Sequence, residues 1–307
     1  MTALLSIVTV MCWGLWIPTA QLRRGVPQQT RTLYAAAGNL VFASGAFLVG
    51  SGHLSLGWRA FWVPFAGGIM WTAGSFCAFR ATQLIGLARA AGSWAPLNIV
   101  MAFVWGAILF GELSGLSGPH WAALGIGVVL VAAGLTVVVR SQVLAAARTP
   151  GPPGRERHVE RSDRSAGRRG LAFAAAAGLL WGSYFVPAQW AKVPAEIGNL
   201  PLAFGIFAAG LALTLPGSAA IRLSLQTAAV QLGAGVLFGA GNLALLALVA
   251  RIGTGTGFTI AQLSLLVNAA FGIWVFGVPP PGSRAARLVL TGVAVAAVGG
   301  CLIGVLQ

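Results

Sequence analysis

Ten long apolar segments, joined mostly by short connections, are the feature of this sequence that most restricts its fold. A helix needs about 20 apolar residues to cross roughly 30 Å of hydrocarbon, and these segments have about that length. They are continuous, whereas a membrane barrel would show segments of about 10 residues with alternating hydrophobicity. We therefore predict an all-α integral membrane protein with ten transmembrane helices, at residues 3–22, 32–50, 60–83, 90–110, 119–139, 170–191, 200–219, 228–249, 255–277 and 286–306.

The composition supports the membrane class. Hydrophobic residues make up 57% of the chain and charged residues 8%, whereas a soluble domain has about 25% charged residues. The first apolar segment lacks the basic region that precedes the core of a cleaved signal peptide. We expect it to be a permanent span.

The second half of the sequence repeats the first. Trp13-Gly14 recurs as Trp181-Gly182, an offset of 168, and Gly134 recurs as Gly299, an offset of 165. Such a slow drift is typical of a duplication followed by a few single-residue losses. The sequence thus predicts a five-helix repeat at 1–139, a linker at 140–169 and a second five-helix repeat at 170–307.

Basic residues indicate the orientation in the membrane. Connections after odd-numbered spans hold sixteen Lys and Arg residues if Arg80 is counted, and the others hold three, Arg59, Lys192 and Arg251. Because basic residues are retained in the cytoplasm, we predict both termini outside the cytoplasmic membrane and the central linker inside. The linker is rich in Arg, Pro and Gly with interleaved acidic residues, which predicts a disordered segment near anionic lipid headgroups rather than a nucleic-acid site.

The residues of metal sites and catalytic centres are few and scattered. The three cysteines lie in predicted spans without a C-x-x-C pair, and no two histidines share a ligand spacing: Cys12, Cys77, Cys301, His53, His120 and His158. The glycine-rich run at 253–257 lies between two apolar spans, which favours a helical hairpin over a phosphate loop. We expect no metal, no cofactor and no enzymatic activity.

Polar and aromatic residues inside the spans are the candidates for a solute site, because a polar group in hydrocarbon must find a partner or line a wet cavity. The candidates are Trp13, Gln21, Trp71, Ser75, Trp94, Asn98, Trp181, Tyr184, Gln189, Asn242, Gln262 and Asn268. Each could instead join helices by hydrogen bonds or anchor a helix at the membrane interface. Both interpretations stay open for each residue.

The chemistry of this set suits a neutral, polyhydroxylated solute. Sugar C–H groups stack on indole faces, and hydroxyl groups exchange hydrogen bonds with both ends of an amide. None of the five acidic residues is expected at the middle of the membrane. This argues against proton-coupled export of cationic drugs, which ordinarily requires such a carboxylate.

Several motifs resemble those of a known transporter superfamily. Trp-Gly followed by Pro in the first and sixth spans, and Phe110-Gly111-Glu112 after the fourth, are similar to the drug/metabolite transporter (EamA-like) superfamily. The run from Gly68 to Ser75, followed by Leu84-Ile85-Gly86-Leu87, resembles its bacterial permeases for glucose, ribose and rhamnose. Ser75 departs from the Asn or Gln usual there, and Gln21 and Gln189 stand where many exporters carry Lys.

The resemblance implies a central cavity lined by spans one, three, four, six, eight and nine. It also implies that spans five and ten support helix contacts or a homodimer. Five helices per unit would place the second copy inverted. Alternating access would follow from rocking movements, with Pro18, Pro187, Gly86 and Gly253 as hinges.

The sequence therefore favours a permease for a sugar or polyol in the cytoplasmic membrane, with the solute and the lipid bilayer as partners. An amino-acid or metabolite exporter of the same superfamily and a membrane scaffold without transport are the alternatives. Arg80 and Arg89 separate the first two possibilities. If they face the cavity an anionic solute is favoured, and if they extend to the interface a neutral one is.

Overall fold

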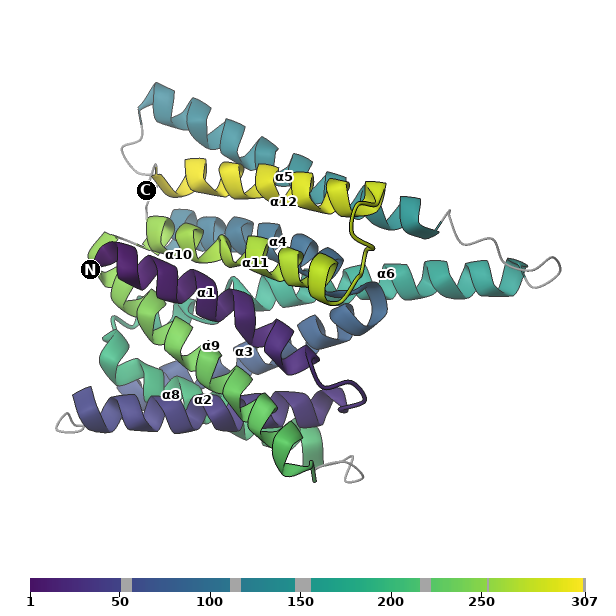
Figure 1. Ribbon diagram of the computed structural model, residues 1–307. Helices are drawn as coiled ribbons and strands as arrows, with labels where there is room; N and C mark the ends of the chain where they lie inside the picture. Colours follow the sequence, from purple (N-terminus) through teal and green to yellow (C-terminus); the bar gives the residue numbers. More distant parts are fainter. Residues whose placement is uncertain (51–56, 111–116, 147–155, 216–221, 253, 306–307) are drawn as a thin grey trace.

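The computed structural model describes residues 1–50, 57–110, 117–146, 156–215, 222–252 and 254–305, and these residues are folded into helices without any strand (Figure 1). The helices of the first half are α1 Thr2–Gln21, α2 Gln28–Gly50, α3 Trp58–Ile85, α4 Leu87–Leu109 and α5 Gly118–Ala146. Those of the second half are α6 Glu156–Trp181, α7 Val186–Trp190, α8 Ala195–Thr214, α9 Leu225–Ile252, α10 Thr254–Gln262, α11 Ser264–Ala270, the π-helix η2 Phe271–Val275 and α12 Arg284–Val305.

Eight helices within the described ranges are long and apolar enough to cross a membrane. Helix α3 is not among them, nor is the segment divided into α10, α11 and η2. The structure therefore fits an integral membrane protein. Its helices lie close to the predicted spans, with boundaries that differ by a few residues at most ends.

The prediction that residues 140–169 are disordered is wrong for part of this segment. Helix α5 continues to Ala146 and α6 begins at Glu156, so helix occupies both flanks of the predicted linker. Arg and Glu have high helix propensity, and extending an existing helix adds one hydrogen bond for each residue fixed. Residues 147–155 lie outside the described part of the chain.

The helices run roughly side by side in one bundle (Figure 1). Helices α5 and α12 form a pair at one edge, and α2, α8 and α9 lie toward the opposite edge. Helix α1 begins and α12 ends on the same side of the bundle, whereas α5 ends and α6 begins on the other side. Helices α1, α3, α4 and α6 occupy the middle with the α10–η2 segment.

Close contacts between glycines and neighbouring backbone hold the bundle together. A Cβ atom on Gly134 of α5 would lie 2.4 Å from the carbonyl oxygen of Gly292 on α12. One on Gly292 would lie 2.6 Å from the oxygen of Gly134. Glycine at both positions therefore lets these two helices approach at backbone distance, as small residues do between membrane helices.

Two helices of the second half are interrupted near the middle of the bundle. Helix α6 ends at Trp181, and a turn over residues 182–185 precedes α7. Helix α10 ends at Gln262, and α11 starts after Leu263. At the first interruption the backbone N–H of Ser183 donates to the carbonyl oxygen of Leu180, and at the second the N–H of Leu263 donates to that of Ile260. Both bonds span three residues, as in a 3₁₀ turn, rather than the four of an α-helix.

Candidate functional site

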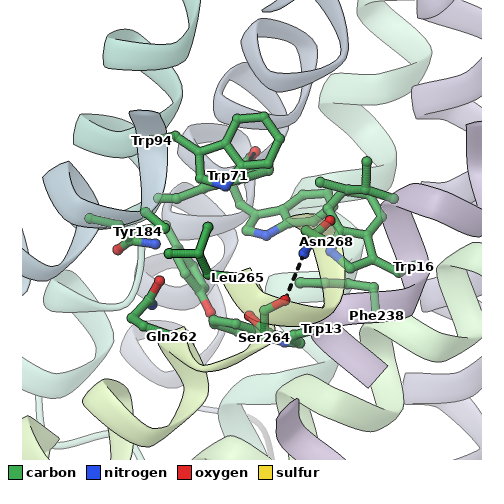
Figure 2. A pocket seen from close by; sticks show the side chains of 14 residues that line it. Trp13, Trp16, Trp71, Trp94, Tyr184, Phe238, Gln262, Ser264, Leu265 and Asn268 are labelled. Atoms are coloured by element: carbon green, nitrogen blue, oxygen red, sulfur yellow. Dashed lines mark hydrogen bonds between the residues drawn. The ribbon is translucent and has the colours of Figure 1, made fainter. Parts of the chain in front are cut away.

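A small central cavity lies where the interrupted helices meet α1, α3, α4 and α9. It has a volume of about 40 Å³. Its lining residues come from both halves of the sequence: Trp13, Trp16, Ile17, Trp71, Trp94, Ala95, Asn98, Trp181, Tyr184, Phe238, Gln262, Ser264, Leu265 and Asn268. Figure 2 shows Gln262, Ser264, Leu265 and Asn268 projecting from one segment toward the aromatic side chains.

Aromatic rings form most of the cavity wall. The Trp71 ring lies 4.1 Å from that of Phe238 and 6.3 Å from that of Trp181, measured between ring centroids. Trp94 meets Trp181 edge to face at 5.4 Å. The Trp181 indole is held in place because its Nε1 donates a hydrogen bond to the Trp71 carbonyl oxygen at 3.1 Å. The result is a rigid, flat-faced wall that includes the predicted residues Trp71, Trp94 and Trp181.

Four buried polar atoms in the wall have no hydrogen-bond partner. Two are donors, Trp13 Nε1 and Gln262 Nε2, and two are acceptors, Asn98 Oδ1 and Asn268 Oδ1. Asn268 uses its other amide atom, Nδ2, to donate to the Ser264 carbonyl oxygen at 3.1 Å (Figure 2). Buried polar groups are nearly always hydrogen-bonded, so donors and acceptors left free around one cavity point to a ligand or water that satisfies them.

The break between α10 and α11 positions the polar side of the cavity. Gln262 is the last residue of α10 and Ser264 the first of α11, so both flank the interruption. Discontinuous membrane helices commonly form solute sites, because irregular backbone is tolerated where it lines a cavity. Tyr184 lies in the corresponding interruption between α6 and α7.

Asn242 is buried below the cavity surface rather than in its lining. The Tyr184 hydroxyl donates to Asn242 Oδ1 at 2.9 Å, and Asn242 Nδ2 donates to Asn199 Oδ1 at 2.9 Å. These two hydrogen bonds connect the Tyr184 hydroxyl to Asn242 of α9 and, through it, to Asn199 of α8. The sequence prediction missed Asn199, which lies one residue before the predicted seventh span.

Three other candidates lie away from the central cavity. Ser75 is fully buried and donates to the Trp71 carbonyl oxygen at 3.0 Å within α3. Gln21 donates to Thr82 Oγ1 at 2.5 Å. Gln189 lines a second cavity, described below.

The candidate hinges have different surroundings. Helix α1 continues through Pro18 to Gln21, whereas Pro187 lies in the first turn of α7, directly after the interruption of α6. Gly86 joins α3 to α4 with φ +79, a conformation that favours glycine. Gly253 lies outside the described residues.

Trp16 is a cavity residue that sequence reasoning missed. It is 4% exposed, and its ring contacts those of Trp71, Phe79, Trp181 and Phe238 at 5.4–6.0 Å. Its position three residues after Trp13 places it on the same face of α1, which is the signal that could have identified it.

Buried polar contacts close the bundle at the end where α1 stops. Arg31 is 5% exposed, and its guanidinium donates to the carbonyl oxygens of Ala20 and Arg23. It also lies 5.8 Å from the centroid of the Phe79 ring. Gln231 of α9 donates to the same Ala20 oxygen at 2.9 Å. The carbonyls at a helix C-terminus carry partial negative charge, so Arg31 is favourably placed there.

Neither Arg80 nor Arg89 lines the central cavity. Arg80 is exposed and donates to Gln83 Oε1 at 3.4 Å. Arg89 is half-buried in the first turn of α4. Exposed Arg80 therefore meets the condition stated above for a neutral solute, whereas Arg89, whose Nε is buried, meets neither condition.

A second, larger cavity of about 360 Å³ adjoins the first. We call it the vestibule. It lies between the start of α3, the α6–α7 interruption, the start of α8 and the last turns of α9. Tyr184 lines both cavities and is therefore their common wall.

Within the described residues, no three His, Cys, Asp or Glu side chains are grouped as metal ligands, and the three cysteines are free. The side chains that line the central cavity carry neutral hydrogen-bonding groups and aromatic rings.

Comparisons with known proteins show the family of the chain. A sequence model of the family described as "Sugar transport protein" matches residues 4–306. A putative sugar uptake protein of Listeria innocua is 24% identical over 305 residues, which is 99% of each chain. The glucose uptake protein GlcU of Bacillus subtilis is 22% identical over 280 residues, which is 90% of this chain and 88% of that protein.

A solved crystal structure shares the fold. It superposes on 99% of this chain and 98% of its own with a TM-score of 0.61, at 17% sequence identity.

Proposed function

We propose that this chain, which belongs to the sugar transport protein family and is a sugar permease, binds one neutral sugar in its central cavity. The observation that carries the proposal is the set of four unpartnered polar atoms among aromatic rings. Two donors and two acceptors match sugar hydroxyl groups, which both donate and accept. The indole faces supply flat surfaces for sugar C–H groups.

The sugar uptake proteins to which the chain is similar support an uptake role here. The distribution of acidic residues also suits a neutral solute. Glu196 is the second residue of α8, and three others lie in the first turns of α6: Glu156, Glu160 and Asp163. Glu112 lies outside the described residues. We therefore do not propose that sugar transport is coupled to an ion gradient through a carboxylate in the middle of a described span.

The protein, in our proposal, crosses the membrane ten times as two inverted five-helix repeats of the drug/metabolite transporter kind. In this proposal the eight apolar helices are eight of the spans, and α3 and the α10–η2 segment are the other two. Equivalent contacts recur in the two halves and support this. A Cβ on Gly38 would lie 2.0 Å from the Leu232 oxygen, and one on Gly205 would lie 2.0 Å from the Phe65 oxygen. Gly205 lies 167 residues after Gly38, and Leu232 lies 167 residues after Phe65, so exchanging the halves converts one pair into the other.

The aromatic contacts repeat in the same way. Gly74 of α3 faces the Trp181 indole, and Gly241 of α9 faces the Trp13 indole. Exchanging the halves exchanges these contacts. Because each half contributes five spans, an odd number, the two copies would have opposite orientations in the bilayer.

In the conformation seen here the central cavity is too small for a sugar. A volume of about 40 Å³ holds roughly three water molecules, since each needs about 10–15 Å³ of such space. A hexose therefore requires the halves to separate. The two helix interruptions and Gly86 are the places where we propose that this movement occurs, as alternating access requires.

Uptake by liposomes tests the function. Purified full-length protein is reconstituted, and entry of labelled glucose, ribose, rhamnose and a panel of amino acids is measured with and without proton or sodium gradients. We expect uptake of at least one sugar and of no amino acid. Amino-acid transport without sugar transport would favour the exporter alternative and contradict the proposal.

A further inference from the structure

The vestibule differs from the central cavity in its chemistry. Of its lining residues, all except Tyr184, Gln189 and Lys192 lack polar side-chain groups. The deep end is formed by buried side chains, including Leu202, Leu245 and Phe258. Such walls match an apolar group better than a free sugar, whose hydroxyls would lose hydrogen bonds there.

The two cavities are in direct succession. Tyr184 belongs to both walls, and Phe258 of the vestibule contacts Trp13 of the central cavity edge to face at 5.9 Å between centroids. A single layer of side chains therefore separates the central cavity from the apolar space. The Tyr184 side chain in this layer donates a hydrogen bond to Asn242.

The vestibule is also open at its outer end. Lys192 and Pro194, which line it, are exposed, whereas Tyr184 and Leu245 at its inner end are buried. A ligand that enters from this side meets the apolar walls before it reaches the polar cavity. The occupant of the vestibule should then be the trailing part of a molecule whose leading part is the sugar.

We propose that the vestibule is a subsite for the apolar aglycone of a glycoside whose sugar occupies the central cavity. Its ligands are glycosides with a short alkyl or aryl group. The proposal depends on the sugar site proposed above, because the sugar anchors the molecule. It predicts that an apolar substituent increases affinity beyond that of the free sugar.

An alkyl series measures this effect. Binding of methyl, propyl and pentyl glucoside to the full-length protein is followed through tryptophan fluorescence, because five indoles surround the central cavity. We expect affinity to rise about threefold to fourfold for each added methylene until the vestibule is filled. Equal affinity for methyl and pentyl glucoside would overturn the proposal.

Matched variants place the alkyl group. Leu246→Asn and Val249→Thr make the vestibule wall polar at two positions on α9 and should remove most of the gain from the alkyl chain while leaving glucose binding unchanged. Val298→Thr makes the same change on an exposed face of α12, outside both cavities, and should keep the full gain. Retention of the gain in both vestibule variants would contradict the proposal.

Two controls separate the possible failures. If glucose itself neither binds nor enters liposomes, the proposed function fails. If glucose binds and the alkyl chain adds nothing, this inference alone fails. Pentanol is the competitor that lacks the sugar. If pentanol displaces pentyl glucoside as strongly as glucose does, the apolar site binds its ligand independently of sugar, as it would bind a lipid chain. That result would also overturn the inference.

Discussion

At the scale of single residues, unpartnered hydrogen-bonding atoms occur both in the proposed sugar site and in contacts between helices. Asn98 and Asn39 are both buried, at 4% and 2% exposure, and both have an unpartnered Oδ1. Asn98 lines the central cavity, whereas Asn39 of α2 does not. The two residues are therefore a matched pair for asking whether the cavity location matters.

Asn98→Ala should raise the KM for sugar uptake about fivefold to tenfold, the effect of losing one hydrogen bond of about 1 kcal/mol. Asn39→Ala should leave the KM unchanged, because it removes the same group outside the cavity. Initial rates of labelled glucose uptake into liposomes measure both values. Equal effects of the two substitutions would show that Asn98 acts through structure alone.

The residue scale also shows what sequence patterns can predict. Spacing along the helices predicted Trp71, Trp94, Asn98, Gln262 and Asn268, all of which line the cavity. Their roles in sugar binding stay predictions. Spacing could not show that Asn242 is satisfied by Tyr184 and Asn199, since those partners come from distant helices.

At the scale of helices, glycines set the distance between neighbours. A Cβ on Gly235 of α9 would lie 1.9 Å from the Ala35 carbonyl oxygen of α2, and backbone cannot move away cheaply. Gly233, on the same helix, has no neighbouring atom within 4 Å of such a Cβ.

Gly235→Ala should therefore lower the free energy of unfolding by several kcal/mol, more than the about 1–3 kcal/mol typical of overpacking, because the clash is with backbone. Gly233→Ala should be neutral or stabilising by about 0.5–1 kcal/mol, since alanine favours a helix. Thermal unfolding in detergent compares the two. Similar melting temperatures for both variants would contradict the contact between α2 and α9.

The helix interruptions illustrate why part of the fold could not be predicted. Pro187 predicted a distortion in the sixth span, and the chain does leave the helix at residues 182–185 just before it. No Gly or Pro marks the break at Leu263. That break follows from the surroundings, where Gln262, Ser264 and Asn268 face a cavity rather than a neighbouring helix.

At the scale of the whole molecule, basic residues gather at one end of the bundle. Arg23, Arg24 and Arg284 lie at connections on the side where α1 ends, whereas Arg59 and Lys192 lie on the side where it begins. The positive-inside rule then places the first side in the cytoplasm, and this orientation is a prediction of our account.

Impermeant thiol labelling of intact cells tests the orientation. In a chain with Cys12, Cys77 and Cys301 replaced by alanine, Lys192→Cys should react from outside. Arg284→Cys should react only after the cells are permeabilised. Both positions are exposed, so access should depend on the side of the membrane. The reverse labelling pattern would contradict this orientation and would mean that the vestibule opens to the cytoplasm.

The central claim concerns the location of the sugar between the two halves, and one labelling rate tests it most directly. Ala95 lines the central cavity, and Ala95→Cys in the cysteine-free chain is a small change. Our account predicts that a saturating concentration of the transported sugar slows reaction of this thiol several-fold, while the exposed Lys192→Cys reacts at an unchanged rate. Equal labelling of Ala95→Cys with and without a sugar that the protein transports would contradict the account.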